Sequence, residues 1–175
     1  MPTKQALLVI DAQANMFDPA NPVADADALL ARLASLVSRA RAAGVPVVFV
    51  RNCGGPQDPD QQGTPGWELH ASLVPEPGEL VLDKTTCDTF ASTPLGDALA
   101  SRGVGEVAIA GLQSEFCIRE TTLGALARGL RVTLVSDAHS TFPGGGRTAA
   151  DVSAEVNAEL GDRASLVATG AVRFG

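Results

Sequence analysis

The sequence predicts an α/β fold, with three layers (α/β/α) built around a six-stranded, mostly parallel sheet. Short apolar runs of the kind found in strands buried on both faces recur along the 175 residues. Segments with helical periodicity separate most of these runs, which is the pattern of a parallel sheet covered by helices. We find no internal repeat and no interdomain linker, so we expect one domain over residues 1–175.

Each element follows from a local pattern. The expected strands are 6–11, 45–50, 79–82, 106–111, 131–136 and 164–169. The expected helices are 25–43, 94–102, 115–128 and 147–160. Gly44 and Gly129 each follow a segment rich in Ala, Leu and Arg, at the position where a left-handed residue ends a helix.

Residues 52–78 interrupt the alternation. The segment carries five Gly and five Pro, and loops of this length in compact domains usually have a function or are disordered. Trp67 and the apolar residues around it favour a lid packed on the domain, and a tolerated surface insertion is the alternative. A second glycine-rich element, PGGG, spans 143–146.

Composition and charge argue against several partners. A net charge of −7 without a Lys/Arg cluster, and few aromatic residues, disfavour nucleic acid. The apolar run before Asp11 is too short for a signal peptide or a membrane span, so we expect a cytoplasmic protein with no membrane partner. Three cysteines, at 53, 87 and 117, without CxxC spacing fit a reducing compartment rather than a disulfide framework.

Residues capable of chemistry gather at the ends of the expected strands. In a parallel sheet these ends meet at one edge, where ligands bind. The candidates there are Asp11, Gln13, Arg51, Asp83, Lys84, Cys117, Asp137 and His139. The chain has no GxGxxG after its first strand, no GxxxxGK[ST] and no GxSxG, so nucleotide binding and serine hydrolysis have little support. A cysteine is the nucleophile left to consider.

Cys117 lies in GLQSEFCIRET, where a strand pattern gives way to a helical one. We expect Ser114 to cap this helix and Cys117 to occupy its first turn, where unpaired N–H groups lower thiol pKa values and can bind an oxyanion. An inert apolar thiol is the alternative. Asp11 as a base, with Lys84 to keep it ionised, would complete a covalent catalytic site.

Three segments together resemble the isochorismatase-like superfamily of cysteine hydrolases, which includes nicotinamidases and N-carbamoylsarcosine amidohydrolases. They are LLVIDAQ, DKTTCDTF and AGLQSEFCIRETTLGALARGLRVTLVSDA, in order over about residues 6–140. The resemblance implies a Rossmann-like fold with six parallel strands and a catalytic triad of Asp11, Lys84 and Cys117. It also implies a homodimer or homotetramer.

The family pattern further implies a cis peptide bond between Leu112 and Gln113, and an oxyanion hole made by the N–H groups of Gln113 and Cys117. The implied reaction is hydrolysis of a C–N bond in a small amide, ureide or cyclic amide through a thioester, without a cofactor. Members that hydrolyse the vinyl ether of isochorismate often lack the cysteine, so the presence of Cys117 favours amide chemistry. The vinyl-ether reaction is the alternative. A thiol-based binding or redox-sensing protein also stays open.

Two departures bear on the substrate. Nicotinamidases carry an Asp-x-His pair and a further His that bind a metal, whereas residues 51–70 contain only His70, with Asp58 and Asp60, so we expect no metal. A zinc site made by the three cysteines and His70 is a remote alternative. Many members also have Ser-Ala-Phe where this chain has Asp-Thr-Phe, at 88–90.

Residues near these motifs are candidates for substrate contact, with packing in the core as the alternative. They are Gln13, Phe17, Trp67, Phe90 and Phe116. Cys53 and Cys87 are expected to be unreactive thiols, with a role in shaping the pocket as the alternative. Asp137 and His139 are expected to be structural, since Asp11 already serves as the base.

Overall fold

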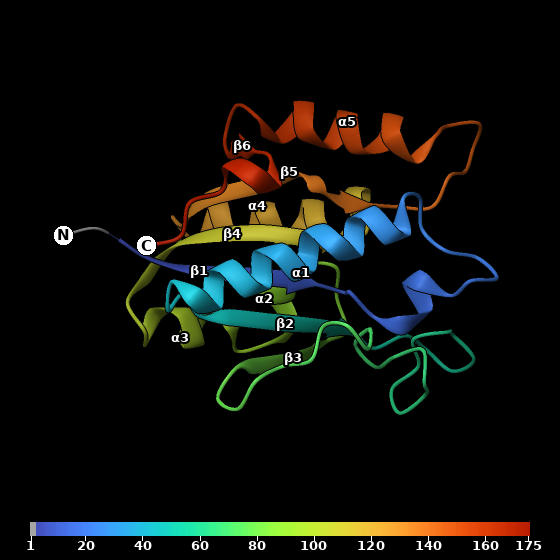
Figure 1. Cartoon of the computed structure of the whole chain (residues 1–175), viewed down its shortest axis with the longest axis horizontal. Helices are drawn as coiled ribbons and strands as arrows, with labels where there is room; N and C mark the ends of the chain where they lie inside the picture. Colours follow the sequence, from blue (N-terminus) through green and yellow to red (C-terminus); the bar gives the residue numbers. More distant parts are fainter. Residues whose placement is uncertain (1–2) are drawn as a thin grey trace.

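A computed structural model describes residues 3–175 and contains one six-stranded sheet in which all the paired strands run parallel (Figure 1). The strand order is β3-β2-β1-β4-β5-β6, the order of Rossmann-like sheets. The strands are β1 Lys4–Ile10, β2 Val47–Asn52, β3 Leu80–Lys84, β4 Val104–Leu112, β5 Arg131–Ser140 and β6 Ser165–Val167. The predicted fold class is therefore confirmed.

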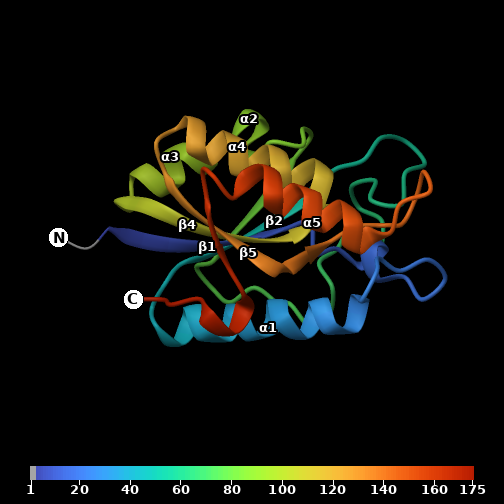
Figure 2. The same cartoon turned by 90° about the horizontal axis from the view of Figure 1, so that it is seen from above.

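Helices cover both faces of the sheet, which makes three layers (Figure 2). Helix α1, Ala26–Ala42, lies on one face, and α2 Thr89–Ser92, α3 Leu95–Ala100, α4 Arg119–Ala127 and α5 Ala149–Leu160 lie on the other. Short turns of other helix types are η1 Ala14–Phe17, η2 Ser114–Ile118 and η3 Thr169–Ala171. No helix among residues 3–175 has the length and apolar character needed to cross a membrane.

Alternate residues of the central strands supply two separate cores. Leu7 and Val9 of β1 pack with α1, whereas Leu8 and Ile10 pack beneath α3, α4 and α5. All four are fully buried, and burying one such side chain is worth roughly 1.5–3 kcal/mol. This two-sided burial explains why β1 reads as a continuous apolar run rather than as an alternating pattern.

Several boundaries differ from the sequence prediction because polar residues continue the strands. Strand β5 extends to Ser140, so Asp137 and His139 lie within it, and β3 includes Lys84. A register shift between Ile109 and Gly111 separates the two paired stretches of β4 and β5. The polar residues at these strand ends have hydrogen-bond partners, so an apolar pattern is not needed there. Helix α2 was not predicted.

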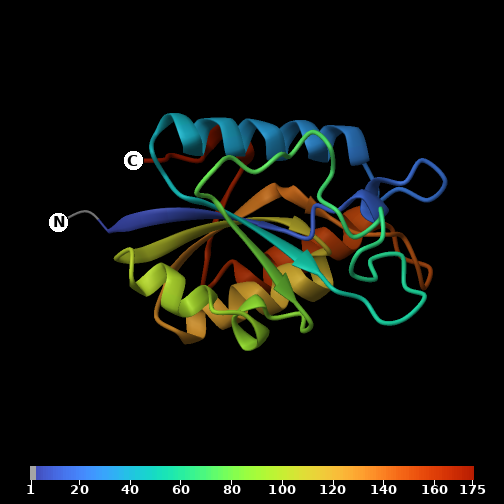
Figure 3. The same cartoon turned by 90° about the horizontal axis from the view of Figure 1, so that it is seen from below.

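Residues 53–79 connect β2 to β3: the first part of this loop lies at the carboxyl edge of the sheet, and the rest runs back along the α1 face to the start of β3 (Figure 3). Trp67 and Leu73 are buried, and the guanidinium of Arg51 lies 3.6 Å from the centre of the Trp67 ring. Single bridges join Gln13 to Leu69 and Gly54 to Gln61. The loop is therefore packed on the domain, as the sequence predicted.

The strand order reverses at β1, which pairs with β2 on one side and with β4 on the other. At this switch point Gly111 has a φ of +127°, and a Cβ atom there would lie 2.0 Å from the carbonyl oxygen of Ile10. Only glycine fits this close approach of β4 to β1. The carboxyl ends of these two strands therefore meet where ligands bind in such sheets.

Candidate active site

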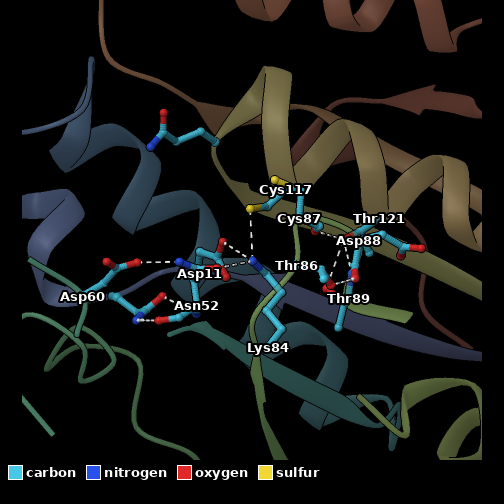
Figure 4. A network of polar contacts seen from close by, with 12 residues as sticks. Asp11, Asn52, Asp60, Lys84, Thr86, Cys87, Asp88, Thr89, Cys117 and Thr121 are labelled. Carbon is cyan, nitrogen blue, oxygen red and sulfur yellow. Dashed lines mark hydrogen bonds and ion pairs between the residues drawn. The ribbon is translucent and has the colours of Figure 1, made fainter. Parts of the chain in front are cut away.

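Lys84 is at the centre of a buried polar cluster (Figure 4). Its Nζ lies 3.0 Å from Oδ2 of Asp11, 3.1 Å from Sγ of Cys117 and 2.9 Å from Oδ1 of Asn52. An ammonium group has three N–H donors, and these three contacts use all of them. The side chain of Lys84 is fully buried, and Asp11 is 1% exposed. The structure thus brings together the three residues of the expected triad.

The sheet determines which side chains can meet here. Asp11 directly follows β1 with a φ of +50°, a left-handed conformation that Asp tolerates better than most residues. Cys117 lies in η2, just after β4. Strands β3 and β1 are separated by β2, so they lie about 10 Å apart. A long side chain such as that of Lys84 is needed to cross this distance.

Burial and charge set the protonation states of the cluster. Burial raises the pKa of Asp11, against the opposing charge of Lys84. Burial works against the charged form of Lys84, but Asp11 and Cys117 outweigh it and raise its pKa. Burial, followed by the charge of Asp11, raises the pKa of the Cys117 thiol well above its usual range. These shifts favour an ammonium at Lys84 and a thiol at Cys117, and the 3.0 Å contact with Nζ of Lys84 favours the ionised form of Asp11.

The expectation that a helix N-terminus lowers the pKa of Cys117 is therefore wrong, because the pKa of this thiol is raised. The η2 segment is a π-helical turn, and Cys117 is only 9% exposed within it. Loss of hydration and the neighbouring carboxylate both oppose the thiolate, and they outweigh Lys84. Activation of this thiol needs removal of its proton by a base.

Ser114 does not cap a helix, contrary to the prediction. Its hydroxyl lies 2.8 Å from Nδ1 of His139 and 2.9 Å from the hydroxyl of Ser153. Gln113 occupies the cap position of η2 and makes no side-chain cap bond. The buried ring of His139 competes for the Ser114 hydroxyl, and this long-range partner was not visible in the local sequence.

The peptide bond between Leu112 and Gln113 is cis, at the position that the family resemblance implied. The carbonyl oxygen of Gln113 accepts hydrogen bonds from the N–H groups of Phe116 and Ile118. Its side-chain oxygen accepts from Thr141 Oγ1 at 3.1 Å. These contacts tie the turn between β4 and α4 to the end of β5.

The side chain of Gln13 has a structural role, because its amide bonds to the backbone of Asn52 and Trp67. It is fully buried, and Nε2 donates to the carbonyl oxygens of Asn52 and Trp67 at 3.0 and 2.8 Å. Oε1 accepts from the N–H group of Asn52 at 2.7 Å. The amide therefore fastens the loop that follows β2 to the end of β1, and these bonds occupy both of its N–H donors.

The aromatic candidates have different surroundings. Phe17 is buried and meets the ring of His70 edge-on at 5.2 Å. Trp67 is buried under Arg51. Phe90 belongs to the core beneath α3 and α4, with the guanidinium of Arg128 4.7 Å from its ring centre. Phe116 is 52% exposed, although it precedes Cys117 in the chain.

Phe17 and His70 line a cavity of about 660 Å³ at the carboxyl edge of the sheet. The N–H group of His70 donates to the carbonyl oxygen of Ala12, the residue after Asp11. Another cavity, of about 580 Å³, lies at the opposite edge and is lined by residues such as Lys4, Pro46 and Arg102. Asp11, Lys84 and Cys117 line neither of these two cavities, but they lie at the first edge, where ligands bind in parallel sheets.

Residues 3–175 contain no group of three or more His, Cys, Asp or Glu side chains arranged to hold a metal ion. The zinc site considered for the three cysteines and His70 is therefore absent from the described chain. Asp60 binds the Asn52 amide instead, at 2.6 Å. Cys53 is half-buried and Cys87 is exposed.

The Asp-Thr-Phe sequence at 88–90 has a local structural role. Asp88 caps α2 by accepting from the N–H group of Phe90 at 2.9 Å. The buried hydroxyls of Thr89 and Thr121 lie 3.0 Å apart. The contact between the two threonines joins α2 to α4.

Asn52 is the residue of the cluster that the sequence analysis missed. It pairs with Lys84 in the ladder between β2 and β3, so its side chain lies beside that of the lysine. The apolar run that predicted the second strand ends at Val50, which left Asn52 in the loop. Extending that strand by two residues would have identified it.

With this geometry established, comparison with known proteins identifies the family. A model of the isochorismatase domain matches residues 5–165. The chain belongs to the isochorismatase family. Among solved structures, an isochorismatase from Pseudomonas putida is 27% identical with a TM-score of 0.88, over 97% of this chain and 92% of that one. The N-carbamoylsarcosine amidase of Thermoplasma acidophilum is 25% identical with a TM-score of 0.82, over 97% and 99%.

Curated relatives include two proteins of Streptomyces noursei named streptothricin hydrolase. One is 50% identical over 138 residues, which are 79% of this chain and 55% of the relative. The other is 44% identical over 168 residues, or 95% and 59%. The chain thus spans a little over half the length of these relatives. A ureidoacrylate amidohydrolase of Methylobacterium radiotolerans is 27% identical over 81% of this chain and 69% of the relative.

Proposed function

We propose that this protein is a cysteine amidohydrolase that cleaves a C–N bond of a small amide, ureide or cyclic amide. The single observation that carries the proposal is the Lys84 ammonium group, which binds both Asp11 and Cys117 in a buried site. A carboxylate, an ammonium and a thiol in contact supply a base, a group that holds the base ionised, and a nucleophile.

Asp11 is the base in this mechanism. Its Oδ1 is buried without a hydrogen-bond partner, so one carboxylate oxygen is free to accept the thiol proton. A raised pKa makes this carboxylate a stronger base than an ordinary aspartate. Proton transfer to Asp11 leaves a thiolate beside the Lys84 ammonium, which stabilises it.

The thiolate then attacks the carbonyl carbon, and the N–H groups of Gln113 and Cys117 bind the oxyanion. Removing one such donor typically costs about 10²–10³ in rate. Asp11 returns its proton to the departing nitrogen, so the C–N bond breaks and a thioester to Cys117 remains. A water molecule, deprotonated by Asp11, attacks this thioester and releases the acid, and the proton returns to the thiol. The balance is one amide and one water giving one acid and one amine.

The names of the relatives suggest which substrates to test first. Streptothricin and ureidoacrylate are the compounds in the names of the relatives described above. We propose a substrate of this kind, in which a C–N bond next to a carbonyl is hydrolysed. The 50% identity over 138 residues makes streptothricin the first choice.

The test is to incubate the protein with streptothricin, ureidoacrylate and a panel of amides and ureides, and to measure loss of substrate by mass spectrometry. Cys117→Ala and Asp11→Asn are the matched inactive variants. We expect hydrolysis by the unaltered protein alone, and a mass increase on Cys117 equal to the acyl group when the reaction is quenched early. Equal turnover by Cys117→Ala, or no turnover across the panel, would overturn the proposal.

A further inference from the structure

The polar cluster continues beyond the triad into the loop that covers it. Nζ of Lys84 donates to Oδ1 of Asn52 at 2.9 Å, and Nδ2 of Asn52 donates to Oδ2 of Asp60 at 2.6 Å. The contacts in Figure 4 therefore link Asp11 to Lys84, Lys84 to Asn52, and Asn52 to Asp60. Asp60 is 9% exposed although it belongs to the loop between β2 and β3.

The orientation of the Asn52 amide is determined by its two neighbours. An ammonium group only donates and a carboxylate only accepts, so the amide oxygen must face Lys84 and the amide nitrogen must face Asp60. The backbone of Asn52 is held as well, because its N–H and carbonyl groups both bond to the Gln13 side chain. The acceptor offered to Lys84 therefore has a fixed position.

We propose that Asn52 and Asp60 are positioning residues for catalysis. Through Asp60, the folded 53–79 loop holds Asn52 in place, and Asn52 in turn orients the Lys84 ammonium group. This inference rests on the proposed function of the triad. Asp60 holds the Asn52 amide, and Asn52 directs one Lys84 N–H away from the triad. The remaining two N–H groups are then aimed at Asp11 and Cys117.

The charge of Asp60 has a second effect, on the pKa of Asp11. The titratable groups that act on Asp11 are Lys84 from β3, Cys117 from η2 and Asp60 from the loop. Asp60 carries a negative charge, which adds to burial in raising the Asp11 pKa, whereas Lys84 lowers it. Arg51, the nearby cation on β2, is engaged by Asp83 and Glu68. Removing the Asp60 charge should therefore make Asp11 a weaker base that stays ionised at lower pH.

The test needs no substrate. The rate of iodoacetamide alkylation at Cys117 is measured against pH for the whole protein, with peptide-resolved mass spectrometry to separate Cys117 from the other two cysteines. The variants are Asp60→Ala, Asp60→Asn and Asn52→Leu. Asp58→Asn is the matched control, because Asp58 lies in the same loop but its carboxylate binds the N–H group of Gly55. Turnover of any substrate found above is measured on the same variants.

We expect Asp60→Ala and Asn52→Leu to slow alkylation and kcat about tenfold, the effect of losing roughly one buried hydrogen bond of about 1.4 kcal/mol. Asp60→Asn keeps an acceptor for Asn52, so it should restore most of the rate. It should also move the acidic limb of the profile to lower pH by about half a unit. Asp58→Asn should match the unaltered protein.

Two results would overturn the inference. One is an Asp60→Ala protein with the alkylation rate and kcat of the unaltered protein. The other is an Asp60→Asn protein as slow as Asp60→Ala with an unmoved acidic limb, which would mark a purely structural role. Asp11→Asn separates this failure from failure of the proposed function. If Asp11→Asn leaves Cys117 alkylation unchanged, the triad itself is wrong.

Discussion

Two polar clusters, one buried and one partly buried, lie side by side at the carboxyl edge of the sheet, and they differ in charge and in hydrogen-bond satisfaction. The reactive cluster, Asp11, Lys84 and Cys117, contains two charges and a carboxylate oxygen without a partner. The structural cluster is His139, Ser114, Ser153 and Asn157, in which hydrogen bonds run from residue to residue. Both clusters have a member in η2, Cys117 in one and Ser114 in the other.

On the proposed function, the first cluster performs the chemistry and the second supports the fold. The bonds of the structural cluster join η2, β5 and α5, and Nδ2 of Asn157 also binds the Ser136 carbonyl at 3.0 Å. Burial lowers the pKa of His139, so its ring is neutral at neutral pH. A satisfied neutral cluster stabilises the turn, whereas an unsatisfied charged cluster retains the capacity to move a proton.

The largest effect should come from the two members of η2. Cys117→Ala removes the nucleophile and should reduce kcat by at least about 10³-fold. Ser114→Ala removes one hydroxyl from the structural cluster and should change kcat only a few-fold. Steady-state kinetics measure both, with circular dichroism to verify the fold. Similar losses in the two variants would contradict the division into reactive and structural clusters.

Breaking the ion pair should give the largest change in stability. Lys84→Met leaves the buried Asp11 carboxylate unpaired, which typically costs about 3–5 kcal/mol. The pKa of Asp11 then rises further, so the folded state binds a proton that the unfolded state releases, and stability falls as pH rises. Urea unfolding at pH 5 and pH 8 measures this. Adding Asp11→Asn should recover stability at pH 8, and a loss independent of pH would contradict the argument.

The structural cluster should respond to pH in the opposite direction. A folded-state pKa for His139 below its ordinary 6.5 means that the unfolded chain binds a proton that the folded one refuses. Stability should therefore fall as pH drops below 6.5. His139→Gln should cost about 1–3 kcal/mol at pH 8 and remove this part of the pH dependence. Thermal unfolding at pH 5.5 and pH 8 compares the two proteins.

The smallest effect concerns the acidic limb of catalysis. Asp11 must be ionised to accept the thiol proton, and burial raises its pKa above the ordinary 3.8. The limb of kcat/KM at low pH should therefore have its midpoint above 3.8, and activity should be lost as pH falls through it. Steady-state rates at each pH, with substrate concentrations from below to above KM, measure this limb. An acidic limb at or below 3.8 would show that Asp11 is not the base.

The sequence predicted the alternation of strands and helices because apolar runs and helical periodicity are local signals. It also predicted that Asp11, Lys84 and Cys117 lie together, because each follows or ends an apolar run and the ends of parallel strands converge. The left-handed glycines at 44 and 129 were predicted correctly, with φ values of +68° and +77°. These features need no knowledge of which strands are neighbours.

Only the tertiary structure decided the partners of the polar side chains. Local sequence suggested a helix cap for Ser114 and a lowered thiol pKa for Cys117, yet His139 takes the hydroxyl and burial raises the pKa. The link from Lys84 through Asn52 to Asp60 likewise depends on the register of β2 with β3 and on the packing of the loop. Hydrogen-bond partners and desolvation are set by residues distant in the chain, so a local pattern finds the reactive groups but not their charge states.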